Sequence, residues 1–170
     1  MEKILLIDEK DDELGFEDKI KIHQQGLLHR AFSIIILNSK GELLLQKRAK
    51  LKYHSGGLWS NTCCSHQRQG EILIEATHRR LKEEMNFDCD LKEAFTFRYA
   101  VKFENGLIEN ELDHVFIGHF DKDPLINLNE AEDFKWSSLN SLKLDIEKNP
   151  QIYTAWFKII IKDFSDYLFS

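Results

Sequence analysis

The sequence predicts a single α+β domain in which strands outnumber helices. Three features support this expectation: apolar segments paired across short turns, helical apolar spacing in the middle and at the end of the chain, and no repeat, low-complexity tract or linker. A chain of 170 residues buries about 70% of the surface that its unfolded form exposes, so its core needs no disulfides. We expect residues 1–170 to be one domain, with residues 1–15 as a weakly ordered N-terminal segment.

A hairpin and a helix are the first expected elements. Residues 31–38 and 42–48 flank the turn SKG, in which Gly41 is available for a left-handed backbone conformation. Residues 71–85 contain no proline or glycine and place apolar side chains at three- and four-residue spacing. This spacing predicts an amphipathic helix.

The second half of the chain continues with strands and ends with helices. Residues 94–103 and 107–120 predict two strands around the turn ENG, and the segment DFKWSS predicts one more. A helix is expected to begin at the serines of this segment, and Pro150 is expected to end it. Residues 153–169 predict a last helix with a wide apolar face.

Basic residues are unevenly distributed in this acidic chain, although a solvated surface is the simpler interpretation of any one basic cluster. The net charge of −6 argues against a nucleic-acid-binding protein. The basic clusters KIKIH, HR, QKRAKLKYH and HRRLK nevertheless all lie before residue 83, so their convergence would create a local anion site. No segment approaches the roughly 18 apolar residues of a membrane span. We expect no membrane partner, and a monomer or a weak homodimer.

The three cysteines predict a reduced, cytoplasmic protein. Two of them, Cys63 and Cys64, are adjacent in the segment NTCCSH, and neighbouring cysteines rarely bond to each other. A total of three cysteines, with Cys89 as the third, leaves one unpaired, and the N-terminal segment lacks the pattern of a signal peptide. A structural zinc site is also disfavoured, because the CC pair has no second pair to complete four ligands.

Two glutamates and several histidines are candidate metal ligands. Glu109 and Glu111 lie two residues apart on an expected strand, so both carboxylates leave the same face and repel unless a cation lies between them. An acidic strand facing solvent is the simpler interpretation of these two residues alone. His23 and His29 flank Gly26, which would let the chain fold back and bring both imidazoles together. With such ligands, Mn²⁺, Mg²⁺ or Zn²⁺ would be suitable.

Five segments in order carry a resemblance to a known family. GLLHRAFS, NTCCSH, RRLKEEM, ENELDHVF and WFKII resemble the type I isopentenyl-diphosphate isomerases of the Nudix superfamily, from about residue 19 to residue 164. The general Nudix signature falls on residues 65–87, where Ser65, Arg80 and Asn86 replace two glycines and a glutamate. The resemblance implies a Nudix-like α/β/α sandwich with a mixed sheet flanked by helices. It also implies an intramolecular 1,3-allylic proton shift in isoprenoid biosynthesis. Gly56 stands where the family often has proline, a difference from which we expect little effect.

The resemblance also implies roles for individual residues. One divalent ion would be held by His23, His29, His66, Glu109 and Glu111, and a second Mg²⁺ would accompany the substrate diphosphate with help from Glu84. The proton-transfer groups would be Cys64, Glu111 and Tyr99, with Cys63 as a packed neighbour. The diphosphate and the isoprenoid carbons would be contacted by Lys19, Arg48, Lys52, Arg80 and Trp156.

Two other functions are compatible with parts of the sequence. A Nudix diphosphohydrolase would need the glutamate that Arg80 replaces, and it would not need the Cys-x-His of residues 64–66. A metal-binding Nudix-like domain without activity would have no use for the implied acid, base and anion-binding residues together. The isomerase is therefore the leading hypothesis.

Overall fold

The computed structural model describes residues 2–170 and shows nine strands and four α-helices in that range. The strands are β1 (Lys3–Ile7), β2 (Glu13–Asp18), β3 (His29–Leu37), β4 (Glu42–Arg48), β5 (Trp59–Ser60), β6 (Cys63–Ser65), β7 (Leu91–Lys102), β8 (Ile108–His119) and β9 (Ala131–Ser138). The helices are α1 (Lys19–Gln25), α2 (Leu73–Met85), α3 (Leu139–Lys148) and α4 (Ala155–Asp163), with the 3₁₀ turns η1 (Pro150–Ile152) and η2 (Ser165–Phe169). Within residues 2–170, no helix is long and apolar enough to cross a bilayer.

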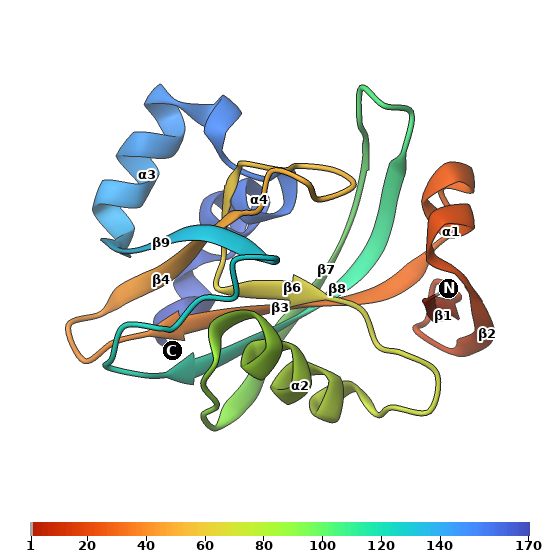
Figure 1. Cartoon of the computed structure of the whole chain (residues 1–170), viewed down its shortest axis with the longest axis horizontal. Coiled ribbons are helices and arrows are strands. Elements are labelled where there is room, and N and C mark those ends of the chain that lie inside the picture. The colour runs from red at the N-terminus through yellow and green to blue at the C-terminus, as the bar shows by residue number, and fades with distance from the viewer. Residues whose placement is uncertain (1) are drawn as a thin grey trace.

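Strand β3 is central in the sheet (Figure 1). It pairs in parallel with β8 from His29↔Glu111 to Leu37↔His119, and in antiparallel with β6. Strands β7 and β8 form the hairpin that the sequence predicts, and β9 pairs with β4. The sheet is therefore mixed, as expected.

The first predicted hairpin is present only at its turn. Strands β3 and β4 meet at the single pair Leu37↔Leu43 and then separate. Thr62 lies between them, because its hydroxyl accepts from Ile36 N at 3.0 Å and donates to Leu44 O at 2.7 Å. The segment that carries the adjacent cysteines thus enters between two strands, which no local sequence pattern predicts.

Helices cover both faces of the sheet (Figure 1). Helix α2 packs Ala76 and Leu81 with Phe32 of β3 in one apolar core. Helices α3 and α4 contribute Leu142 and Phe157 to a second core. Because successive side chains of a strand point to opposite faces, the apolar run of β3 supplies both cores. The expected α/β/α sandwich is confirmed.

The N-terminal segment is more regular than the sequence suggests. Strands β1 and β2 form an antiparallel hairpin, and Leu6 pairs with His29 of β3. Ile4 and Leu5 are fully buried, so this short apolar run belongs to the core. Residues 3–7 and 13–18 therefore belong to the sheet, whereas the sequence suggests weak order for residues 1–15.

Helix α1 follows this hairpin and was not expected. The Asp18 carboxylate accepts from the backbone N–H groups of Ile20 and Lys21, which caps the helix at its N-terminus. Gly26 ends it with a φ of 64°, a conformation that glycine adopts without steric cost. His23 is thus a helical residue, and Gly26 turns the chain toward His29.

The last helix is shorter than the apolar pattern of residues 153–169 predicts. Helix α4 ends at Asp163, and Phe164 leaves the helical conformation with φ of −127° and ψ of 9°. The Phe164 ring stacks on Phe95 of β7 with their centroids 4.8 Å apart. This contact favours the turn η2 over a continued helix. Helix α4 and η2 both bury apolar side chains in the same core, which is why the apolar pattern continues beyond the helix.

Candidate active site

Five buried side chains from four parts of the chain converge at one end of β3 and β8. Their ligand atoms all lie within 4.8 Å of one another: His23 from α1, His29 from β3, His66 after β6, and Glu109 and Glu111 from β8. The two glutamates share a face because they are two residues apart, whereas Asn110 points away and donates to Gly26 O at 3.0 Å. All five residues are at most 6% exposed, so a solvent-facing acidic strand is excluded.

Backbone carbonyls orient two of the imidazoles. Nδ1 of His23 lies 2.6 Å from Lys19 O, and Nδ1 of His29 lies 2.8 Å from Leu27 O. Because a carbonyl oxygen only accepts, Nδ1 must donate in both rings and Nε2 faces the cluster. This arrangement is typical of histidines that bind metals.

The inward-facing atoms fit a divalent cation. Nε2 of His29 and of His66 lie 3.1 and 2.9 Å from Oε1 of Glu111. His23 Nε2 and Glu109 Oε2 are 3.2 Å apart, yet both atoms are buried without a hydrogen-bond partner in the described part of the chain, residues 2–170. Buried polar atoms without partners are costly, and a cation between them would satisfy both.

The protonation of the cluster reflects its two carboxylates. Burial by itself lowers the pKa of His29, but hydrogen bonds and charges of Glu109 and Glu111 raise it to about 10. Burial lowers the pKa of His66 to about 4 against the opposing effect of Glu111. The two carboxylates therefore favour positive charge at the centre of this cluster.

The two adjacent cysteines have different environments. Cys63 is fully buried and packs in the core under α2, whereas Cys64 lines a pocket beside the metal-ligand cluster. Sγ of Cys64 lies 3.6 Å from Nη1 of Arg48. Burial raises the pKa of the Cys64 thiol to about 12, with Arg48 opposing the shift. The thiol is therefore protonated at neutral pH.

A tyrosine and a glutamate lie on the other side of β3 in the same pocket. Tyr99 pairs with Glu111 in register across β7 and β8, and its hydroxyl donates to Glu111 Oε2 at 2.6 Å. Cys64 on β6 and Glu111 on β8 are separated by β3, and both line the pocket. Trp156 closes one wall and donates Nε1–H to Asn61 Oδ1 at 3.1 Å.

Four basic side chains surround this pocket. They come from α1, β4, the loop after β4, and α2: Lys19, Arg48, Lys52 and Arg80. Within residues 2–170, Nε of Arg48 and Nε of Arg80 are buried and without a hydrogen-bond partner. The basic clusters thus converge on one pocket.

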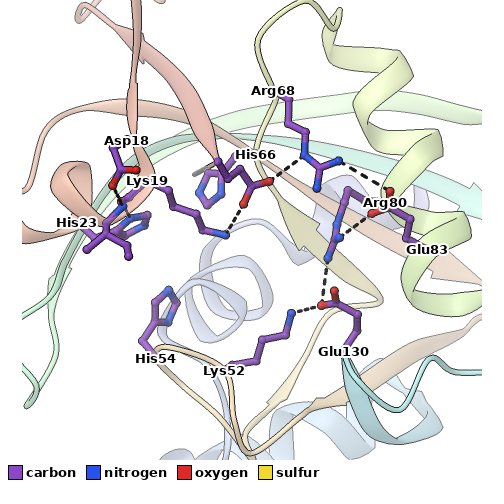
Figure 2. A network of polar contacts seen from close by, with 12 residues as sticks. Asp18, Lys19, His23, Lys52, His54, His66, Arg68, Arg80, Glu83 and Glu130 are labelled. Atoms are coloured by element: carbon purple, nitrogen blue, oxygen red, sulfur yellow. Dashed lines mark hydrogen bonds and ion pairs between the residues drawn. The ribbon is translucent and has the colours of Figure 1, made fainter.

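Carboxylates hold three of these cations in a chain of ion pairs (Figure 2). Lys19 Nζ lies 3.1 Å from Glu2 Oε2, and Arg80 Nη2 lies 3.1 Å from Glu130 Oε2. Glu130 also contacts Lys52, so one carboxylate joins two cations from separate elements. These contacts orient the basic side chains around the pocket.

Comparison with known proteins identifies the family. A family model described as the NUDIX domain matches residues 27–157. An isopentenyl-diphosphate Delta-isomerase 2 of Photorhabdus laumondii is 55% identical over 164 residues, which are 96% of this chain and 93% of that protein. A protein of the same name from Aromatoleum aromaticum is 52% identical and spans 91% of this chain and 82% of its own length. This chain belongs to the isopentenyl-diphosphate Delta-isomerases of the Nudix family.

Solved structures support the fold of this isomerase family member. A crystal structure from Deinococcus radiodurans covers 96% of this chain and 99% of its own, with a TM-score of 0.78 at 16% identity. A MutT protein from Methanosarcina mazei Go1 covers 82% of this chain and 94% of its own, with a TM-score of 0.65 at 21% identity. At these identities the likeness concerns the fold alone.

Glu84 lies apart from the five-residue cluster of the isomerase. Its carboxylate accepts from Gln46 Nε2 at 2.7 Å and forms an ion pair with Arg80. Glu84 is 3% exposed, so both contacts are shielded from solvent. Glu84 is therefore next to a pocket-lining cation, on the α2 side of the site.

Two buried residues beside the site, His54 and Asp113, were not expected from the sequence. His54 is 6% exposed and contacts Glu109, although the basic composition of its segment QKRAKLKYH is typical of a surface loop. Asp113 is buried beside the pocket and accepts from Ser33 Oγ at 2.7 Å. The period-two spacing of 109, 111 and 113 could have indicated Asp113, but a single histidine in a loop has no periodic pattern.

The loop 49–58 that carries His54 depends on Gly56. A Cβ atom at this position would lie 2.4 Å from Lys50 O. Backbone atoms cannot move aside as the end of a side chain can, so only glycine fits. The backbone conformation of this loop therefore favours glycine at position 56, and the effect expected of glycine in place of proline stays a prediction.

Proposed function

We propose that this chain interconverts isopentenyl diphosphate and dimethylallyl diphosphate, as the names of its relatives indicate. The reaction moves a double bond by one position: a proton is added at C4, a tertiary cation forms at C3, and a proton leaves from C2. An alkene is a very weak base, so the reaction needs an acid on one side of the carbon skeleton and a base on the other.

Cys64 is proposed as the group on one side. Its thiol is protonated, lines the pocket and lies beside Arg48, so it has a proton to exchange with a bound substrate. Cys63 is enclosed by apolar side chains and is proposed to have only a packing role.

Glu111 and Tyr99 are proposed as the groups on the other side. Oε1 of Glu111 faces His29 and His66, while Oε2 accepts the hydroxyl hydrogen of Tyr99. The carboxylate therefore belongs both to the cluster of ligands and to the pocket. A proton taken from the substrate or given to it can be shared between Glu111 and Tyr99.

The five-residue cluster is proposed to bind one divalent ion, with Mn²⁺, Mg²⁺ and Zn²⁺ as candidates for its His and Glu donors. When bound, the ion would supply positive charge that keeps Glu111 ionised and oriented. A second Mg²⁺ is proposed to accompany the diphosphate, with Glu84 as its contact on α2. The ion pair of Glu84 with Arg80 supports this proposal by placing it beside an anion-binding cation.

The basic residues and the tryptophan are proposed to bind the two parts of the substrate. Lys19, Arg48, Lys52 and Arg80 would contact the diphosphate, which supplies binding energy remote from the reacting carbons. Trp156 would lie over the isoprenoid carbons and stabilise the cation by about 2 kcal/mol when water is excluded.

We also propose a protein of the cytoplasm that acts on its diphosphate substrate as a monomer or a weak homodimer. Its three cysteines are free, which supports a reducing compartment. The proposed unit is one domain comprising residues 1–170.

One observation carries the proposal: a protonated thiol and a carboxylate with a bound tyrosine line one pocket from opposite sides of β3. A diphosphohydrolase has no need of this pair. To test it, the protein is incubated with isopentenyl diphosphate and Mg²⁺ in heavy water. We expect deuterium-labelled dimethylallyl diphosphate without release of phosphate. Release of phosphate without isomerised product would instead show a hydrolase.

A further inference from the structure

His54 lies at the edge of the five-residue cluster and has no role in the function described so far. It belongs to the loop 49–58 between β4 and β5, and it is 6% exposed. Its Nε2 contacts Oε1 of Glu109, whereas Oε2 of the same carboxylate faces His23 and His29 at 3.2 and 3.6 Å. The two oxygens of Glu109 thus have different partners.

The His54 ring is fixed in place by its surroundings. It stacks on Phe103 with centroids 4.5 Å apart and planes 10° apart, and Tyr53 meets it edge-on at 4.3 Å. The backbone is held as well, because Arg48 Nη2 donates to His54 O at 3.3 Å and Asn105 Nδ2 donates to Tyr53 O at 3.0 Å. The ring therefore has little freedom to turn away from Glu109.

The partners of the ring determine where its proton belongs. Carboxylate oxygens only accept, so an attractive contact with Glu109 requires a hydrogen on Nε2 of His54. Nδ1 lies 3.1 Å from Ser55 Oγ, and this hydroxyl can donate to it. In residues 2–170, Nε2 is buried and makes no other polar contact, and its contact with the Glu109 oxygen is an ion pair and not a well-aligned hydrogen bond.

His54 is not itself a member of the ligand set. The atoms within 4.8 Å of one another come from five residues, and His54 is not among them. A nitrogen that carries hydrogen also has no lone pair for a metal ion. A residue that contacts a metal ligand from outside the cluster is placed to orient that ligand.

We propose that His54 is a positioning residue that donates Nε2–H to Oε1 of Glu109 and thereby directs Oε2 to the metal ion. This inference rests on the proposed metal-binding function of the cluster. It also connects the metal site to the substrate site, because Lys52, proposed to contact the diphosphate, lies two residues before His54 in the same loop.

Three variants of the full chain test this role by binding of Mn²⁺ alone. His54→Phe keeps an aromatic ring to stack on Phe103 but lacks the N–H group, and His54→Gln keeps an N–H donor but lacks the ring. His78→Phe is the matched control, since His78 lies on α2 and pairs with Asp88 away from the cluster. Thermal unfolding in the presence of a chelator establishes that each variant is folded.

We expect His54→Phe to weaken Mn²⁺ binding by about 10- to 100-fold, His54→Gln to weaken it less, and His78→Phe to leave it unchanged. Competition with a chelating dye measures these dissociation constants without use of the substrate. Wild-type affinity in His54→Phe, or equal losses in the Phe and Gln variants, would overturn the role of His54 alone. Absence of Mn²⁺ binding by the wild-type protein would overturn the proposed metal site and the role of His54 with it.

Discussion

Tyr99 donates its hydroxyl hydrogen to Oε2 of Glu111 at 2.6 Å, and the two residues are paired directly across β7 and β8. The other oxygen of Glu111 faces His29 and His66. A single carboxylate therefore joins the ligand cluster to the substrate pocket. Its orientation depends on partners on both sides.

Replacement of Tyr99 by phenylalanine removes one of these partners and leaves the ring. We expect kcat for isomerisation to fall about tenfold or more, which corresponds to the roughly 1–1.5 kcal/mol of a hydrogen bond. Metal content should fall less than in a ligand variant, because Tyr99 supports the ligand Glu111 but is outside the five-residue cluster. Steady-state rates and metal analysis of the same sample measure both effects. A rate equal to that of the wild-type enzyme would remove Tyr99 from the mechanism.

Loss of a metal ligand should have a different effect. His66→Ala and Glu109→Ala each remove a donor from the cluster, so bound metal and activity should fall together. Elemental analysis after gel filtration, compared with activity, provides the measurement. His119→Ala serves as a control, since His119 lies at the far end of β8. Full metal occupancy in both ligand variants would contradict the site.

Glu84→Ala should leave the tightly bound metal ion in place. The carboxylate contacts Gln46 and Arg80 and lies outside the cluster, so the variant should retain its metal. We expect instead a higher Mg²⁺ or substrate concentration at half-maximal rate. Rates measured over a range of Mg²⁺ concentrations at saturating substrate, and over a range of substrate concentrations at saturating Mg²⁺, test this change. Unaltered kinetics would exclude Glu84 from the diphosphate site.

Gly56→Ala tests the close approach in the loop 49–58. The new Cβ would lie 2.4 Å from Lys50 O, so the loop must shift. Steric changes of this kind cost about 1–3 kcal/mol, measurable as a lower free energy of unfolding in urea. Lys50→Ala, an exposed change in the same loop, should cost far less. Equal stability of the Gly56 variant and the wild-type protein would contradict this geometry.

Much of the site is predictable because it follows the periodicity of strands. Two-residue spacing places Glu109 with Glu111 and separates Cys63 from Cys64, and the structure confirms both relationships. The long hairpin of β7 and β8 and helix α2 likewise follow from alternating and helical apolar patterns.

The remaining features depend on contacts that are distant in sequence or on local capping, which leaves no apolar pattern. The separation of β3 from β4 requires the Thr62 hydroxyl to bond both strands, and His54 reaches the cluster only because its loop folds over Phe103. Helix α1 is short, so its stability comes from the Asp18 cap and from packing more than from apolar spacing. None of these interactions leaves a periodic trace in the chain.

The central claim is that Cys64 exchanges a proton with the substrate whereas Cys63 only packs. The adjacent thiols are chemically identical, but one lines the pocket and the other is fully buried under α2. The most direct measurement compares the isomerisation rates of Cys64→Ala and Cys63→Ala at equal metal content. Loss of an acid/base group predicts a fall of roughly 10²–10⁴-fold for Cys64→Ala and only a small change for Cys63→Ala. An active Cys64→Ala enzyme, or the larger loss in Cys63→Ala, would contradict the mechanism.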